Sequence, residues 1–457
     1  MTHPSKQHGS SGIDPVEARF GRSVWLVLAL AALVRGAWAL LAPVVPVSDC
    51  EAYDLFARNL AAGGAFGFKP DEPSLFWPPG ASFLYSLGYR ISPPEQLGFA
   101  LATLFNLACG VALVAVSMDL ARGWFGRRAA LVCGLVLALW PMHVEFTTLI
   151  ASELSFTLLC LLALRAWGSE STSPRRALLA VLVTGLCLAA ATYIRPTALL
   201  LPVVFASVDI LRERKLAAPA LRAAGALLVI FACVLPWSLR NQRHFGRFVL
   251  VSANGGSNLW MGNNPQTTGY YQPLPELGLT NQAEIDEELA RRAKAYIRAE
   301  PAAFVVRTLK KAALLHRSET IGVVWNEAGL AQRAPDVFGA GTRGVKLLKL
   351  ASTAYWWIVL AAALLGWAML ARSRGAWAAL THPATALWAY FVAVHAVIVI
   401  QDRYHFPATP MIAALAGLAF ARAQRDEPVA RAQRDESGAR AQRDEPVARA
   451  QRDDGSS

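Results

Sequence analysis

Long apolar blocks, separated by short polar or charged segments, occupy most of the chain from Val24 to Ala421. A helix of about 20 predominantly apolar residues crosses a bilayer, whereas the helices of soluble proteins are more amphipathic than these blocks. The pattern predicts ten spans, of which the third and fifth are short: Val24–Val44, Leu97–Met118, Ala129–Met142, Leu149–Arg165, Ala177–Thr192, Thr197–Leu211, Ala223–Leu239, Leu350–Ala371, Ala384–Ile400 and Phe406–Ala421.

The expected fold is therefore an all-α polytopic membrane protein with ten or eleven transmembrane helices. The eleventh would be a half-span or re-entrant segment at Ala81–Ile91. Two amphipathic segments, Gln282–Arg298 and one that begins at Pro301, are predicted to be surface helices because each has only one apolar face.

The positions of Lys and Arg give the orientation, since short cytoplasmic loops are enriched in both. If the ten spans alternate, the short arginine-rich loops after the second, fourth, sixth and eighth spans fall on one side, together with Arg19 and Arg22 before the first span. That side is predicted to be cytoplasmic. The other side receives two long outer loops, residues 45–95 and 240–349, and three short segments: Pro141–Thr148, Tyr193–Pro196 and Gln401–His405.

Three regions follow from this pattern: a cytoplasmic segment (1–21), a transmembrane domain (22–421) and a tail (422–457). The first apolar block is too long for a typical signal peptide and is interpreted as a retained anchor. From Ala421 a charged unit of nine residues, ARAQRDEPV and its variants, occurs four times. Such a sequence cannot bury a core, so the tail is expected to be disordered.

Composition supports the membrane interpretation, because 54% of the residues are hydrophobic and 17% are charged. The net charge is +12, but the basic residues lie between the apolar blocks and in the tail, which does not fit a nucleic-acid-binding face. Five of the six cysteines lie in apolar blocks, and none forms a CxxC or metal-binding pattern. We expect neither a disulfide framework nor a cysteine-bound metal.

Carboxylates stand out among the outer residues. Asp49, Glu51 and Asp54 follow one another in the first outer loop, where Ser48 and Glu51 form a capping-box pattern that predicts a helix ending at Gly63. A general base needs a carboxylate close to the acceptor hydroxyl, and Asp49 is the preferred candidate. Glu51 has the alternative role of a helix cap.

Glu153 is a further catalytic candidate, because it falls within the fourth predicted span. An ionisable group there costs about 2.5–3.5 kcal/mol on insertion scales, so it is usually functional or paired. The alternative is a neutral Glu153 that is hydrogen-bonded to Thr148 or Ser155.

Three motifs at the outer ends of predicted spans each place an arginine at that surface, against the positive-inside trend: Arg195, Arg240 and Arg403. Arginine pairs with phosphate through two parallel hydrogen bonds, so these residues are candidates for binding a lipid phosphate. The alternative is ordinary snorkelling at helix ends. Amides and aromatic rings of the kind that bind sugars give the other substrate-binding candidates: Tyr53, His143, Asn258, Asn263, Asn264 and Tyr404.

Five features occur in order along the chain: the acidic first loop before Pro78-Pro79-Gly80, the Glu153 segment after Trp140-Pro141, the Ile194-Arg195-Pro196 turn, the PWSLRN segment with GGSNLWMGNNP, and RYHFP. In these five features the chain resembles the GT-C membrane glycosyltransferases. The resemblance extends from about Arg22 to Arg422. It most resembles bacterial relatives of protein O-mannosyltransferases and of the lipid A aminoarabinose transferase.

The resemblance implies a polyprenyl-phosphate sugar as donor, a base at Asp49, and phosphate binding by Arg195, Arg240 and Arg403. Many relatives have an Asp-Glu pair where this chain has Asp49-Cys50-Glu51, which leaves the role of Glu51 open. The expected reaction is one in-line displacement, with inversion, onto a lipid, protein or glycan hydroxyl.

The cofactor prediction is limited to a possible divalent metal between Asp49 and Glu51, for which the spacing offers no convincing ligand set. Two other functions compete with transfer: a transporter or flippase of polyprenyl-linked lipids, and a lipid-binding scaffold. A composition rich in Ala and Arg suggests a bacterium of high genomic GC content, and thus the inner membrane with the site on its periplasmic face.

Overall fold

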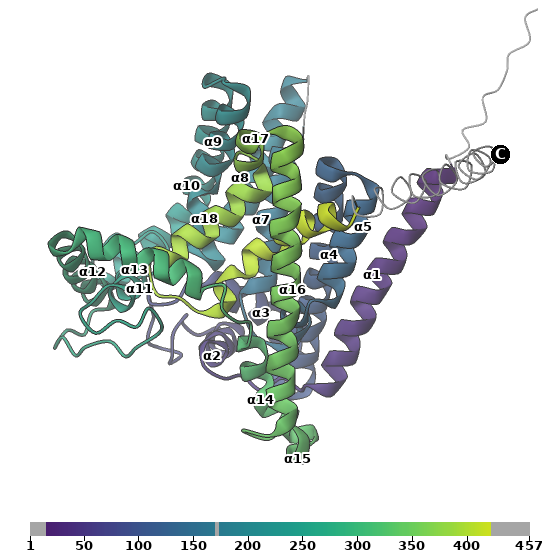
Figure 1. The fold of residues 1–457 in the computed structure, drawn as a ribbon. Helices are drawn as coiled ribbons and strands as arrows, with labels where there is room; N and C mark the ends of the chain where they lie inside the picture. Colours follow the sequence, from purple (N-terminus) through teal and green to yellow (C-terminus); the bar gives the residue numbers. More distant parts are fainter. Residues whose placement is uncertain (1–14, 170–172, 422–457) are drawn as a thin grey trace, which may run out of the picture.

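The protein is described by a computed structural model that covers residues 15–169 and 173–421 (Figure 1). The predicted tail and most of the predicted N-terminal segment lie outside these residues. Within the described ranges the chain is helical, and its only extended pairings are two isolated bridges, Lys69 with Glu72 and Tyr270 with Ile400. The prediction of an all-α membrane protein is confirmed.

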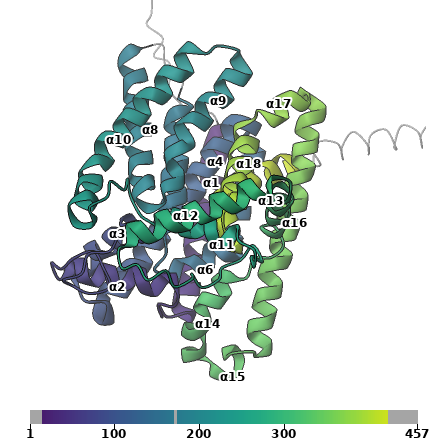
Figure 2. The ribbon, with the colours of Figure 1, turned by 90° about the vertical axis from the view of Figure 1, so that its left-hand side faces the viewer.

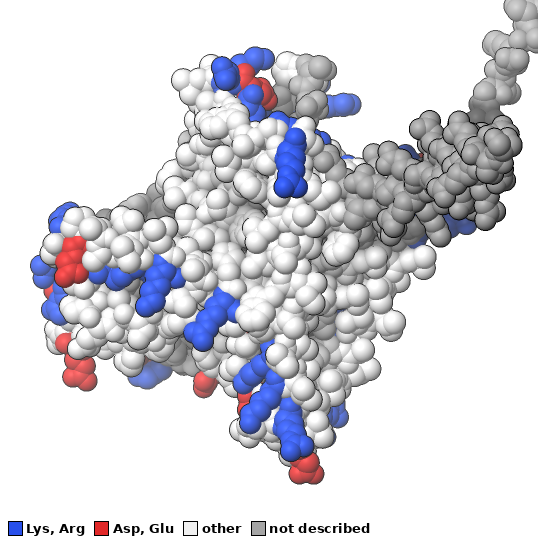
Figure 3. Space-filling model, in the orientation of Figure 1, with Lys and Arg blue, Asp and Glu red and all other residues white. Residues whose placement is uncertain are grey.

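Apolar helices form the body of the molecule. In order these are α1 (Pro15–Leu41), α4 (Phe99–Phe125), α5 (Arg127–Leu139), α7 (Glu153–Trp167), α8 (Pro174–Ile194), α9 (Leu201–Glu213), α10 (Ala217–Phe245), α16 (Arg343–Arg374), α18 (Pro383–Val397) and the final segment Asp402–Ala421. Each predicted span therefore coincides with a helix. Figure 3 shows a wide uncharged surface between charged ends, as expected of a body embedded in lipid.

Length separates these helices into two groups. Six are long and apolar enough to cross a membrane, and a seventh span results if α5 and the bent continuation Pro141–Thr148 are counted together. Among the described residues, α7, α9 and α18 are shorter than a full crossing. In the part of the chain that the structure describes, ten helices thus lie where the ten spans are predicted, but only six or seven of them are long and apolar enough to cross a membrane.

The final segment lies at the centre of the molecule. Its most apolar window is 89% buried, compared with 17% for α1. Close packing against small residues explains this position: a Cβ atom at Gly366 of α16 would lie 1.9 Å from the Leu415 carbonyl, and one at Gly417 would lie 2.4 Å from that of Ala129. The RYHFP motif at the start of this segment is therefore held rigidly.

A break in the chain after α5 is stabilised by an arginine that the sequence analysis did not single out. Arg35, fully buried in α1, donates hydrogen bonds to the carbonyls of Leu137 and Ala138 at the end of α5. These carbonyls have lost their helical partners because α6 (Pro141–Glu145) continues at an angle of 57°. Arg35 thus acts as the C-terminal cap of the broken helix.

The outer loops fold into helices that lie across the bundle (Figures 1 and 2). The first contains α2 (Asp49–Ala61) and α3 (Gly80–Ile91). The second contains α11 (Gly255–Gly262), α12 (Gln282–Ala299), α13 (Pro301–Leu314), α14 (Ile321–Arg333) and α15 (Pro335–Phe338). Both predicted surface helices are present. The two loops are joined where the Gln282 side chain accepts a 2.6 Å hydrogen bond from the Leu75 amide.

One local prediction is wrong. Helix α2 begins at Asp49 and has Gly63 after its end, at φ 81°, as expected, but Ser48 makes no capping hydrogen bond through its side chain. Ser48 adopts φ 54°, unusual for a residue other than glycine. With the backbone turned in this way, its side chain lines a pocket instead. Backbone strain of this kind is common beside functional residues.

Candidate active site

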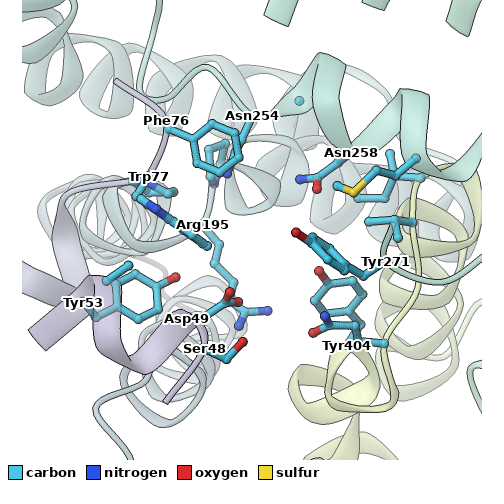
Figure 4. Close-up of a pocket in the computed structure, with 18 of the residues that line it drawn as sticks. Ser48, Asp49, Tyr53, Phe76, Trp77, Arg195, Asn254, Asn258, Tyr271 and Tyr404 are labelled. Carbon is cyan, nitrogen blue, oxygen red and sulfur yellow. The ribbon is translucent and has the colours of Figure 1, made fainter. Parts of the chain in front are cut away.

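A pocket of about 770 Å³ opens where α2, the turn after α8, α11 and the RYHFP segment meet. Four parts of the chain that are distant in sequence contribute Asp49, Arg195, Asn258 and Arg403 to its lining. Figure 4 shows Asp49 and Arg195 side by side, with Tyr53 and Trp77 on one side of the pocket and Tyr271 and Tyr404 on the other. The fold therefore collects the predicted acid, cations and rings in one place.

Four charged side chains form a continuous network of ion pairs at the base of this pocket. Arg403 contacts Asp49 through Nη2 and Glu153 through Nη1, the latter at 2.9 Å. Arg195 contacts the same Glu153 oxygen and donates two further hydrogen bonds, of 3.0 and 2.8 Å, to the Ser152 hydroxyl. Two carboxylates and two guanidinium groups thus alternate, so their formal charges cancel.

The four side chains of this network differ in how far they are buried. The Glu153 side chain is fully buried and that of Arg403 is 4% exposed, whereas those of Arg195 and Asp49 are 12% and 21% exposed. Glu153 is not among the pocket-lining residues and lies behind both arginines. The predicted alternative of a neutral Glu153 bonded to Thr148 or Ser155 is wrong, because its partners are the two arginines and Ser152.

Aromatic side chains give the pocket an amphipathic wall. Tyr53 and Trp77 pack edge to face with ring centroids 5.6 Å apart, and Phe76 packs against the same indole. Tyr404 stacks on His395 on the opposite side. Burial raises the pKa of Tyr53, so its hydroxyl is a neutral donor at physiological pH. Rings around a few polar groups suit the apolar faces and hydroxyls of a sugar.

Four of the residues predicted to bind the sugar or the phosphate do not line the pocket. Among them, Asn263 and Asn264 donate to the backbone carbonyls of Val397 and Trp260, respectively, so their amides support the α11 region rather than face the pocket. His143 is fully buried, bonded to Thr409 and stacked on Phe406.

Arg240 is the fourth of these residues. Its guanidinium lies over the Trp237 ring, and its Nη1 donates a hydrogen bond to the Ser74 carbonyl. It therefore links α10 to the first outer loop, and it is not among the residues that line the pocket.

The sequence analysis missed several groups that hold Arg403 in place. The Gln401 amide oxygen accepts a 2.6 Å hydrogen bond from Arg403 Nε. Asp402 caps α14 by accepting hydrogen bonds from the Thr320 and Ile321 amides. No local pattern in the sequence indicates that these residues support Arg403. Their position directly before the RYHFP motif is the one signal that could have suggested it.

A buried pair on the far side of Arg403 completes its support. Glu319 and His405 approach to 3.0 Å, and Trp140 donates its indole N–H to the same carboxylate. Burial raises the pKa of the Glu319 carboxyl. His405 also stacks on Trp356 at 4.2 Å. The segment that carries Arg403 is thereby fixed to the outer loop between α13 and α14.

The residues present do not form a metal site around Asp49. No group of three His, Cys, Asp or Glu side chains in residues 15–169 and 173–421 is placed to hold an ion. Asp49 is engaged by Arg403, and Glu51 is exposed at the pocket wall. The metal considered between Asp49 and Glu51 therefore has no further ligand in this part of the chain.

Comparison with known proteins agrees with the motifs. The family model described as dolichyl-phosphate-mannose-protein mannosyltransferase matches residues 77–239, which include Glu153 and Arg195. The fold is that of the GT-C membrane glycosyltransferases. The resemblance predicted from the sequence is thus confirmed.

Solved structures support the fold assignment. The archaeal oligosaccharyltransferase AglB from Archaeoglobus fulgidus, in complex with an inhibitory peptide and a dolichol-phosphate, superposes with a TM-score of 0.51 at 14% identity, over 90% of this chain and 51% of that one. The apo form of the Archaeoglobus fulgidus oligosaccharyltransferase gives 0.53 at 14% identity, over 90% and 52%. The chain thus spans about half the length of these enzymes.

A further structural match is ArnT from Cupriavidus metallidurans bound to undecaprenyl phosphate, with a TM-score of 0.42 at 17% identity, over 87% of this chain and 78% of that one. No curated protein sequence matches this chain.

Proposed function

We propose that this protein is a membrane glycosyltransferase that moves a sugar from a polyprenyl-phosphate donor to an acceptor hydroxyl on the non-cytoplasmic face. One observation carries the proposal: a partly exposed carboxylate, Asp49, lies beside two arginines in a pocket walled by aromatic rings. A base, cations for an anionic leaving group and a surface for a sugar are the parts that such a transfer requires.

The two arginines are assigned to the phosphate. Arg195 and Arg403 both reach the pocket and are held by the shared carboxylate of Glu153. Guanidinium groups fixed in advance stabilise negative charge as it develops on the departing oxygen, without a cost of reorganisation during the reaction. Arg240 is given no part in this step, because it lies over Trp237.

Asp49 is assigned the role of general base. The acceptor oxygen attacks the anomeric carbon and passes its proton to the Asp49 carboxylate, while the bond from that carbon to the phosphate oxygen breaks. The electron pair of this bond leaves with polyprenyl phosphate. A single displacement from the face opposite the leaving group inverts the anomeric centre.

A groove beside the pocket supports a lipid carrier. It has a volume of about 370 Å³ and is lined mainly by apolar side chains, among them Leu200, Val203 and Leu211 of the α9 region. Tyr390 lines the groove and donates its hydroxyl to the carbonyl of Thr197, which lines the pocket. A long apolar tail in this groove would leave its phosphate end near Arg195. AglB, whose complex contains a dolichol-phosphate, is similar in fold.

The predicted orientation of the protein in the membrane supports a site on the non-cytoplasmic face. The short arginine-rich loops lie on one side of the predicted topology and the pocket residues on the other, so the site is assigned to the periplasmic face of a bacterial inner membrane. A nucleotide sugar would be presented on the opposite, cytoplasmic side.

The test is turnover of radiolabelled polyprenyl-phosphate sugars by membranes that contain the wild type or Asp49→Asn. Loss of the base is expected to lower turnover by a factor of about 10²–10⁴. Asp71→Asn, an exposed aspartate of the same outer loop, is the matched control and should retain activity.

Equal turnover by the wild type and Asp49→Asn would remove the base assignment. Absence of transfer by the wild type with every sugar tried would favour the transporter hypothesis.

A further inference from the structure

The Asp49–Arg403 contact has a consequence for the order of events at the site. We propose that in the empty protein Asp49 occupies the position on Arg403 that the donor phosphate will take, so that donor binding releases the base. This inference rests on the proposed function, and it adds that Asp49 and the donor phosphate compete for one guanidinium group.

Charge balance is the first argument. Asp49 and Glu153 neutralise Arg195 and Arg403 one for one. Each of the three nitrogens of Arg403 has a partner: Nε bonds Gln401, Nη1 bonds Glu153 and Nη2 contacts Asp49. A phosphodiester donor brings at least one more negative charge. It can bind strongly only if one of the carboxylates yields its place on Arg403.

Burial decides which carboxylate yields. Glu153 is fully buried and is held by Arg195 as well as Arg403, so its departure from the site would also leave Arg195 without a carboxylate partner. Asp49 is 21% exposed, contacts only Arg403 through its side chain among the described residues, and is the first residue of a helix in an outer loop. Asp49 is therefore the mobile partner.

Arg195 offers the phosphate a first contact. Its Nε and Nη2 are bonded to Ser152 and Glu153, while its Nη1 makes no hydrogen bond with the described residues, and the side chain reaches the pocket. A phosphate that binds there lies beside Arg403 and can displace Asp49. The displaced carboxylate is then free of its arginine partner and faces the pocket.

The mechanism therefore couples the base to the donor. Without donor, the Asp49 carboxylate is paired with Arg403 and is not available to an acceptor. With donor bound, Asp49 is unpaired in the pocket and is ready to accept the proton of an incoming acceptor. The expected kinetic order is donor first and acceptor second.

The test is the affinity of the full-length protein for polyprenyl phosphate, the product without its sugar, measured in detergent or nanodiscs. Because Asp49 competes for Arg403, Asp49→Asn and Asp49→Ala should each bind polyprenyl phosphate at least about tenfold more tightly than the wild type, although neither transfers sugar.

Glu51→Gln is the matched control, because Glu51 lines the same pocket but does not contact Arg403. It should change the affinity by less than about threefold. Equal tightening by Glu51→Gln and Asp49→Asn would show a general effect of pocket charge and overturn the proposal, as would unchanged or weaker binding by both Asp49 variants.

Arg403→Gln separates this inference from the proposed function. Binding by the wild type that is lost in Arg403→Gln supports the donor-phosphate site, whatever the Asp49 variants do. No binding of polyprenyl phosphate by the wild type would overturn both the donor assignment and the competition.

Discussion

At the scale of single residues, Glu153 and Asp49 illustrate how burial divides the work between two carboxylates. Both contact Arg403, but one is fully enclosed and the other faces a pocket. An enclosed carboxylate between two arginines cannot approach an acceptor, so the role that we propose for Glu153 is that of a positioning residue. It contacts both Arg195 and Arg403 and would hold them at a fixed separation.

Removal of the Glu153 charge tests this role. Glu153→Gln leaves Arg195 without a carboxylate partner and Arg403 with Asp49 alone, and breaking a buried ion pair typically costs about 3–5 kcal/mol. We expect a clear fall in the melting temperature in detergent and a higher KM for the donor. Glu51→Gln, which changes an exposed carboxylate in the same pocket, should leave the melting temperature unchanged. Similar melting of both variants would contradict the role given to Glu153.

At the scale of elements, buried cations stabilise helix ends where the backbone has lost its own partners. Lys311 of α13 is buried and donates to the carbonyls of Gly262, Val397 and Ile398, at the ends of α11 and α18. Burial lowers its pKa to about 8, so the ammonium form, which has three donors, still dominates at neutral pH. This single side chain holds two walls of the pocket together.

Lys311→Met should therefore loosen the pocket wall. The carbonyls of Gly262 and Ile398 would lose this donor, at a cost of about 1–3 kcal/mol for each unsatisfied group, while that of Val397 would keep Asn263. We expect lower thermal stability together with faster proteolysis of the loop after α11. Lys310→Met provides the control, because the adjacent Lys310 is exposed. If the two variants behave alike, Lys311 does not perform this function.

The cap that Arg35 places on α5 depends on a glycine in the neighbouring helix. A Cβ atom at Gly110 of α4 would lie 2.6 Å from Arg35 Nε, whereas one at Gly123 of the same helix would meet nothing within 4 Å. Gly110→Ala is thus expected to displace Arg35 and destabilise the fold by about 1–3 kcal/mol, the usual cost of overpacking. Gly123→Ala should be neutral or slightly stabilising. Thermal unfolding of the two variants compares them directly.

At the scale of the whole molecule, the pocket is assembled at one end of the bundle by segments that lie 354 positions apart in the case of Asp49 and Arg403. The helices supply a rigid frame, and the outer loops close over it. The pocket must open on the side of the membrane where its substrates are. Which side that is depends on the topology of the whole fold.

Sidedness can be measured with single cysteines introduced into a cysteine-free variant. A cysteine at position 71, in the first outer loop, should react with a membrane-impermeant thiol reagent in intact spheroplasts. A cysteine at position 214, in the arginine-rich loop after α9, should react only after the membrane is permeabilised. The reverse pattern would place the pocket on the cytoplasmic side and exclude the proposed topology.

The sequence by itself determined the membrane class, the positions of the helices and the outer surface helices, because these depend on local runs of apolar residues and on nearby charges. It also nominated Asp49, Glu153, Arg195 and Arg403, since ionisable groups beside or within apolar blocks are costly. By the same reasoning it nominated Arg240, which lies away from the pocket.

Only the tertiary structure decided which of these residues meet, because a local pattern carries no information about a partner hundreds of positions away. The packing of small residues around the final segment places Arg403 between Asp49 and Glu153. The capping role of Arg35 was hidden for the same reason: it depends on carbonyls freed by a bend in another helix. The pairing of charges is a property of the folded molecule, and so is the proposed division of these residues into base, positioning residue and phosphate ligands.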